Sequence, residues 1–297
     1  MAQHQFVFDA IGTTWKIDID ESMTTRTSAS LLVEIQKRIE QFDHDYSRFR
    51  ADSLVTTMAK TAGTYILPPD AEPLFSLYQE LFVATRGAFT PLIGSVLVEA
   101  GYDATYTLRP STLHQPPSWD EVIAYHYPRL TLKRPVLLDF GAAGKGYLID
   151  IVSTLLRESG VQSFCVDAGG DIYYHHKKND ALRVGLEHPQ ALDEVIGVAT
   201  IVNQSICGSA GNRRAWANFH HTIDPFTLTS PQHILATWVV AHTTIIADAL
   251  TTCLFLVPRK EFVVSYSFEY AILYADFSLE KSAAFPAEFF LSPTQPL

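Results

Sequence analysis

The sequence predicts an α+β protein in which β-sheets pack against helices within a single mixed domain over residues 1–297. Helical and strand patterns are interspersed along the chain, and no linker divides it cleanly. With 297 residues, of which 47% are hydrophobic, the chain is long enough to bury a sizeable core.

The first half of the chain contains both kinds of element. Residues 6–19 predict two short strands around a turn at 11–13. Apolar side chains recur at helical spacing over about 28–43, and again over 74–81. The prolines of 103–122 predict a loop.

The second half alternates strands with two helices. The predicted elements, in order, are a strand over 130–140, a Gly-rich turn, a helix over 147–160, strands within 163–175 and up to 206, a strand over 237–241, a helix containing 247–252 and a strand pair near 261–274. We expect the helix over 147–160 to bury Leu148, Ile151, Val152 and Leu155 on one face.

Composition excludes several classes of partner. A net charge of −10 disfavours nucleic acid and anionic membrane surfaces. No window of about 18 residues is apolar enough to span a bilayer, and the N-terminal residues do not have the pattern of a signal peptide. The three cysteines lack zinc-ligand spacing and fit a reducing compartment. We therefore expect a cytoplasmic protein without membrane insertion; an exported protein trimmed for expression is the alternative.

Two side chains of the segment ADALTT, Asp248 and Thr252, are four residues apart. On a helix this spacing places a carboxylate and a hydroxyl on one face, an all-oxygen pair that suits Mg²⁺ bound to a phosphate substrate. The alternative is a helix cap, for which Asp and Thr are common residues.

The segment GAAGKG at 141–146 lies between a predicted strand and a predicted helix. Glycines there would let backbone N–H groups approach a phosphate, with Lys145 reaching in. The spacing fits neither a Walker A loop nor a Rossmann fingerprint. A tight turn with an exposed lysine is the alternative. His221 lies three residues before the acidic Asp224. It is either a structural histidine or a general base.

Nine segments follow one another in an order that resembles the ApbE family, the FAD:protein FMN transferases. They are IGTTW (11–15), DYSRFRADS (45–53), RGAFTPLIG (86–94), DFGAAGKGYLID (139–150), VDAGGDI (166–172), VGLEHP (184–189), SAGNRR (209–214), HTIDPFTL (221–228) and ADALTT (247–252).

The resemblance implies a cleft that binds FAD as substrate, with Mg²⁺ on its pyrophosphate. The implied metal ligands are Asp248, Thr252 and the carbonyl of Gly144. The implied contacts to FAD are Ile11, Phe49, Ala88, Phe89, Thr90, Gly141, Lys145, Tyr147 and the backbone of Thr222. Thr90 and Leu92 stand where the family usually has a carboxylate and a hydroxyl, so we expect an altered FAD pocket.

The resemblance also implies the reaction. His221 would accept the proton of a Thr or Ser hydroxyl on an acceptor flavoprotein, which receives FMN as AMP departs. Because only neutral imidazole accepts a proton, we expect the rate to rise through pH 6–7 and then level off. An FAD pyrophosphatase and a non-catalytic FAD-binding or storage protein are the alternatives that the sequence leaves open.

Overall fold

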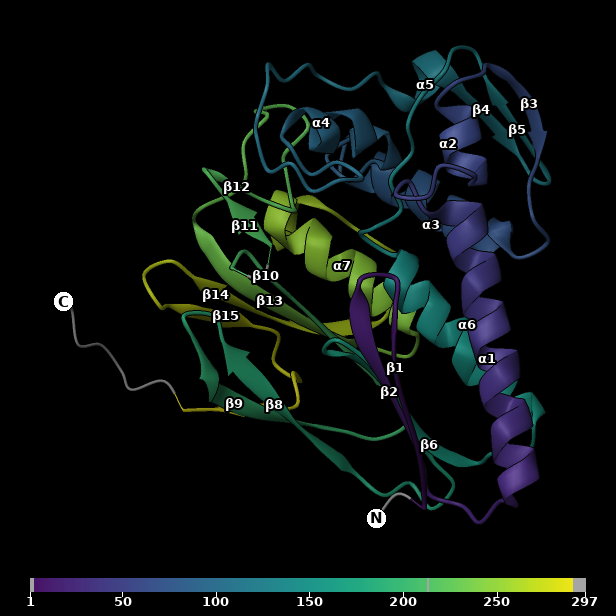
Figure 1. Cartoon of the computed structure of the whole chain (residues 1–297). Helices are drawn as coiled ribbons and strands as arrows, with labels where there is room; N and C mark the ends of the chain where they lie inside the picture. Colours follow the sequence, from purple (N-terminus) through teal and green to yellow (C-terminus); the bar gives the residue numbers. More distant parts are fainter. Residues whose placement is uncertain (1–2, 213, 291–297) are drawn as a thin grey trace.

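The centre of the molecule is an eight-stranded antiparallel sheet in the order β1-β2-β6-β7-β10-β13-β14-β15 (Figure 1). The computed structural model describes residues 3–212 and 214–290. The strands are β1 (His4–Ala10), β2 (Thr13–Ile19), β6 (Ser163–Ala168), β7 (Asp171–His176), β10 (Ser205–Ala210), β13 (Ile234–Ala241), β14 (Phe268–Tyr274) and β15 (Leu279–Lys281). Arg213, in the segment SAGNRR, lies outside the described residues.

Two tight hairpin turns meet at one end of this sheet. Ile11 and Gly12 join β1 to β2 with φ angles of 42° and 76°, and Gly169 and Gly170 join β6 to β7 with 68° and 96°. Positive φ at both central residues is typical of two-residue hairpin loops. A Cβ added to Gly169 would lie 2.1 Å from Oγ1 of Thr13, so the close contact between the turns requires glycine.

Three helices cover one face of the sheet: α1 (Thr25–Tyr46), α6 (Gly144–Glu158) and α7 (Thr244–Leu256) (Figure 1). Alternate residues of β2, among them Trp15 and Ile17, are fully buried in the core that these helices complete. Leu148 and Val152 of α6 are buried as predicted, while Ile151 and Leu155 are partly buried against the same core.

The other face of the sheet packs against a small sheet with the order β16-β9-β8. Its strands are β8 (Leu182–His188), β9 (Ala191–Ile201) and β16 (Ala287–Phe289). The main sheet is thus the middle layer, with α6 and α7 on one face and the small sheet that contains β8 on the other (Figure 1).

A smaller layer of helices and short strands lies beyond this end of the sheet (Figure 1). Its elements are α2 (Leu54–Met58), β3 (Gly63–Ile66), α3 (Ala71–Ala84), η1 (Pro91–Ile93), α4 (Gly94–Glu99), α5 (Trp119–Val122), β4 (Ile123–His126) and β5 (Arg129–Leu132). The remaining short elements are β11 (Ala215–Trp216), β12 (Phe219–His220) and η2 (Arg259–Glu261). The α+β class predicted from the sequence is confirmed, and none of the described helices is long and apolar enough to cross a membrane.

Three predicted boundaries were wrong. The strand predicted over 130–140 ends at Leu132. Beyond it, the backbone N–H groups of Val136 and Asp139 donate to the carbonyls of Met58, at the end of α2, and Pro91, in η1, instead of to a neighbouring strand. The loop predicted over 103–122 ends in helix α5, where a capping box starts the helix. In the pair predicted near 261–274 only β14 is a strand, and it pairs with β13 and β15.

Candidate functional site

A cavity of about 780 Å³ lies at the end of the main sheet where the hairpin turns meet. It brings together many of the residues that the sequence singled out: Phe49, Ala88, Phe89, Thr90, Gly141, Lys145, His221, Thr222, Asp248 and Thr252. These residues come from segments spread over two hundred positions of the chain, so their convergence is a property of the fold. A cavity of this size is in the range of ligand-binding clefts.

Three of the predicted site residues lie outside the cavity lining. Tyr147 points into the core, where its hydroxyl donates to the backbone carbonyl of Asp70 at 2.6 Å. Gly144 begins α6 and is buried. Ile11 lies in the β1–β2 turn, where the lining residues are instead Gly12 and, at the start of β2, Thr13.

Asp248 is fixed by the close approach of α6 and α7. The backbone N–H of Gly146 donates to its Oδ2 at 2.8 Å. A Cβ on Gly146 would lie 2.3 Å from the carbonyl oxygen of Thr244 and 2.6 Å from Cβ of Asp248, so only glycine permits this contact. Burial raises the pKa of Asp248, and the nearby charge of Lys145 opposes that shift.

The start of α7 is held by a carboxylate from α6. Both oxygens of Asp150 accept backbone hydrogen bonds at 2.8 Å, from Thr244 and Ile245, which is how a capping side chain satisfies a helix N-terminus. Burial raises the pKa of Asp150 to about 6. The segment GKGYLID therefore contributes to the position of Asp248 through both Gly146 and Asp150, a role that sequence reasoning missed.

Replacing Gly146 by Ala tests this packing. We expect Gly146→Ala to force α6 and α7 apart, to lower the free energy of unfolding by about 1–3 kcal/mol, and to impair the Asp248 site. Thermal unfolding and ligand titration would measure both effects. Gly144→Ala, on the same helix, is the matched control, because a Cβ there would lie no closer than 3.6 Å to its nearest neighbour, Phe140. A Gly146→Ala protein as stable as wild type would contradict the prediction.

Asp248 and Thr252 fit the requirements of a divalent cation. Both line the cavity from successive turns of α7, and Oδ1 of Asp248 has no hydrogen-bond partner within the described ranges. Thr251, by contrast, is buried and bonds Ser209 and the carbonyl of Asp248. Among the described residues no group of three or more His, Cys, Asp or Glu side chains is arranged to hold a metal. The protein therefore offers one carboxylate and one hydroxyl, a sparse donor set of the kind that Mg²⁺ uses when substrate phosphates complete its coordination.

Lys145 projects from the N-terminus of α6 into the cavity, where its Nζ forms an ion pair with Oδ2 of Asp171. Asp171 is the first residue of β7, its side chain is 2% exposed, and its Oδ1 accepts a hydrogen bond from the backbone of Gly208 at 3.2 Å. Asp171 belongs to the segment VDAGGDI, but the sequence did not single it out as a site residue. The structure adds Asp171 to the site.

The two adjacent histidines have different environments. His220 accepts from the backbone N–H of Thr222 at 3.3 Å and contacts the carbonyl of Pro231 at 3.0 Å, so both its ring nitrogens are engaged by the loop. His221 lines the cavity, and its buried Nδ1 has no partner among the described residues. Burial, helped by Arg214, His220 and Lys145, lowers the pKa of His221 to about 3. Its imidazole is therefore neutral at physiological pH.

An aromatic wall forms one side of the cavity. Phe49 and Tyr102 line it, and the guanidinium of Arg48 lies 4.1 Å and 4.9 Å from the centres of their rings. Arg48 also pairs with Asp139 at 2.5 Å. Such a wall provides apolar surface for a planar ring. Arg48, Tyr102 and Asp139 are functional candidates that sequence reasoning missed.

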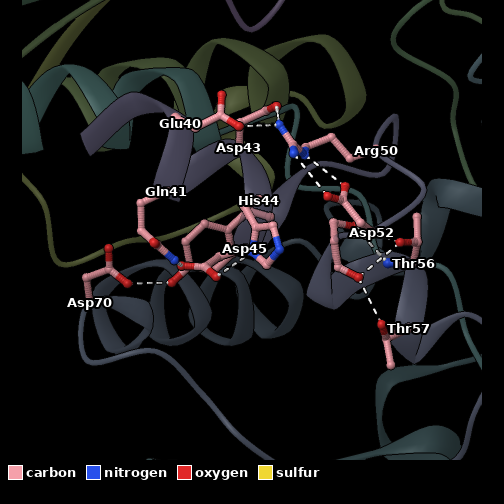
Figure 2. A network of polar contacts seen from close by, with 12 residues as sticks. Glu40, Gln41, Asp43, His44, Asp45, Arg50, Asp52, Thr56, Thr57 and Asp70 are labelled. Carbon is pink, nitrogen blue, oxygen red and sulfur yellow. Dashed lines mark hydrogen bonds and ion pairs between the residues drawn. The ribbon is translucent and has the colours of Figure 1, made fainter. Parts of the chain in front are cut away.

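The segment that carries Arg48 and Phe49 is anchored just beyond them by Arg50 (Figure 2). Arg50 pairs with Asp52 at 3.0 Å, and with Glu40 and Asp43 of α1 at 2.7 Å and 3.3 Å. Single exposed ion pairs contribute little, but several sharing one guanidinium restrict where the segment can lie. The network therefore connects the C-terminal part of α1 to the aromatic wall.

Thr90 lines the cavity, and its Oγ1 also accepts a hydrogen bond from the backbone N–H of Leu92 at 3.2 Å. It is thus the cap of the short helix η1. Leu92 is 1% exposed and belongs to the core. Of these two departures within the segment RGAFTPLIG, only Thr90 faces the ligand space.

Together, this fold and this cleft define an α+β enzyme whose site combines acidic oxygens, a lysine and a neutral histidine. The chain belongs to the ApbE family, whose sequence model matches residues 11–267. It is 25% identical over 276 residues to the FAD:protein FMN transferase of Haemophilus influenzae, covering 83% of this chain and 78% of that protein. It is equally similar, over 278 residues, to the protein of the same name from Treponema pallidum, covering 83% and 76%.

Solved structures agree on the fold. The ApbE protein of Thermotoga maritima superimposes with a TM-score of 0.81 at 19% identity, covering 94% of this chain and 97% of that one. The flavin transferase ApbE of Vibrio cholerae gives a TM-score of 0.75 at 17% identity, covering 96% and 99%. The family resemblance inferred from the nine segments is thereby confirmed.

Proposed function

We propose that this protein transfers the FMN moiety of FAD to a Thr or Ser hydroxyl of an acceptor flavoprotein, in a Mg²⁺-dependent reaction that releases AMP. The names of its relatives support flavin transfer. The observation that carries the proposal is the convergence of Lys145, neutral His221 and the Asp248–Thr252 pair in one cavity. Phosphoryl transfer requires placement and charge neutralisation more than covalent help, and this set supplies both.

In the proposed reaction, the acceptor hydroxyl oxygen attacks the FMN-side phosphorus of the FAD pyrophosphate. A new P–O bond forms to the acceptor, the P–O bond to AMP breaks, and the hydroxyl proton passes to His221. The neutral imidazole is in the form that accepts a proton. Lys145 would bind the pyrophosphate, and the aromatic wall at Phe49 and Tyr102 would provide apolar contacts for a ring of FAD.

Asp248 and Thr252 would hold Mg²⁺. When bound, this cation would neutralise charge on the pyrophosphate and on the departing AMP. Because the protein carries a net charge of −10, an anionic substrate needs such local positive charge to enter the cavity.

The proposal is tested by incubating the protein with FAD, Mg²⁺ and a candidate acceptor flavoprotein, followed by intact-mass spectrometry and nucleotide chromatography. We expect the acceptor to gain the mass of an FMN adduct while AMP accumulates in equal amount. An acceptor variant with Ala at the modified Thr or Ser is the control. Free FMN and AMP without adduct would identify a pyrophosphatase, and unchanged FAD would identify a binding protein; either result overturns the proposal.

A further inference from the structure

The ammonium group of Lys145 pairs with Asp171 in the cavity that Asp248 also lines. Its neighbour in sequence, Gly146, donates its backbone N–H to Asp248, while the Lys145 side chain itself pairs with Asp171. Asp171 and Asp248 both line the cavity and are 1% and 6% exposed. The cavity thus places one lysine and two buried carboxylates in its lining, and the lysine pairs with Asp171.

The surroundings of Asp171 favour its role as the partner of Lys145. It follows the tight Gly169-Gly170 turn on β7, and the backbone of Gly208 donates to its Oδ1. Its buried Oδ2 has no hydrogen-bond partner among the described residues, so the ion pair with Lys145 is its only polar contact there. A buried carboxylate without a counter-charge is costly, so Asp171 holds the ammonium firmly.

The position of Lys145 decides whether Asp248 can bind a cation. An ammonium on Asp248 would neutralise that carboxylate and repel a divalent ion from it. The cluster of Asp171, Lys145 and Asp248 carries one net negative charge, whereas Lys145 and Asp248 without Asp171 carry none. The negative charge of Asp171 therefore compensates the lysine, so that Lys145 and a divalent cation can be bound in the same cavity.

We infer that Asp171 is a positioning residue that holds Lys145 away from Asp248 and thereby keeps Asp248 open to a divalent cation. This inference rests on the metal-dependent form of the proposed function. It assigns to the strand-end aspartate an electrostatic role in cation affinity, exerted through Lys145 and without contact to the cation.

The test is Mn²⁺ binding to the protein without FAD, followed by the electron paramagnetic resonance signal of free Mn²⁺. Asp171→Asn is expected to weaken Mn²⁺ binding on the order of 10- to 100-fold, the usual effect of losing a residue that supports a metal ligand. The double variant Asp171→Asn/Lys145→Met restores one net negative charge at Asp248, and we expect it to recover most of the lost affinity. Such a recovery cannot come from a residue that merely supports the fold.

The matched control is Asp18→Asn, which removes the same charge from the same cavity, where Asp18 pairs with Lys16 at 2.9 Å. We expect its Mn²⁺ affinity to stay close to that of wild type. The inference is overturned if Asp171→Asn binds Mn²⁺ normally, if the double variant binds as weakly as Asp171→Asn, or if wild type binds no Mn²⁺. FMN transfer by wild type is measured separately, so its failure alone would count against the proposed function and not against this charge arrangement.

Discussion

Replacement of Asp248 by Asn is expected to reduce Mg²⁺-dependent FMN transfer by on the order of 10³-fold or more, because cation assistance to phosphoryl transfer contributes several kcal/mol. The Asn oxygen can still accept the hydrogen bond from Gly146, which Asp248 accepts at 2.8 Å. The fold should therefore survive while the negative charge at the cation site is lost. Transfer rates over a range of Mg²⁺ concentrations, together with thermal unfolding, measure the two effects.

Asp248→Ala is the harsher variant. It also leaves the buried N–H of Gly146 without a partner, which costs about 1–3 kcal/mol of stability. We expect both variants to lose activity and only the alanine variant to lose clear stability. A protein with Asn at position 248 that keeps the wild-type rate and metal dependence would show that the cation site lies elsewhere.

Neighbouring threonines of α7 provide a matched comparison. Thr252 lines the cavity, whereas Thr251 is buried and bonds Ser209. Thr252→Val should raise the Mg²⁺ concentration needed for half-maximal rate with little change in stability. Thr251→Val should lower the stability and leave the Mg²⁺ concentration needed for half-maximal rate nearly unchanged.

The sequence predicted the long helices well because their signal is local. Apolar residues at helical spacing identified α1 and α6 without knowledge of any partner. The start of α6 was predicted three residues late, at Tyr147, because Gly144 and Gly146 carry no apolar signal and glycine disfavours helix interiors. In the fold, the glycine at 146 is what allows α7 to approach.

The contacts that position the site residues could not be predicted, because they join segments far apart in the chain. Arg48 and Asp139 are 91 positions apart, and Gly146 and Asp248 are 102 apart. No local pattern connects such pairs. Tyr147 illustrates a different difficulty: it belongs to a family segment, but its hydroxyl bonds the carbonyl of Asp70 and its ring packs in the core. Motif membership alone does not separate ligand contacts from structural ones.

The pH dependence expected from the sequence must also be revised. A solvent-exposed histidine titrates near pH 6.5, but burial lowers the pKa of His221 to about 3. The imidazole is then neutral throughout pH 5–8. The titration of His221 should therefore leave the transfer rate unchanged through pH 6–7. Protonation of His221 should lower the rate only as the pH falls toward about 3.

The same shift affects stability in acid. The pKa of His221 is lower in the folded state than in the unfolded state. The free energy of unfolding is therefore undiminished by this histidine above about pH 6.5, where the ring is neutral in both states. It decreases as the pH falls toward 3, where the buried ring must accept a proton. His221→Ala should therefore unfold at lower pH than wild type in an acid titration followed by circular dichroism.

His221→Ala is expected to lower the rate of FMN transfer by roughly 10²–10⁴-fold, the usual contribution of a general base, while FAD binding largely survives. His220→Ala is the informative contrast, because His220 bonds Thr222 and Pro231 and its loss should reduce stability more than it reduces the rate. Single-turnover transfer with saturating FAD, alongside FAD titration, separates these effects. If His221→Ala keeps near-wild-type turnover, the proton goes elsewhere. Asp224 is then a weak candidate, because it is not among the residues that line the cavity and its Oδ1 already accepts hydrogen bonds from the backbone of Phe226 and Thr227.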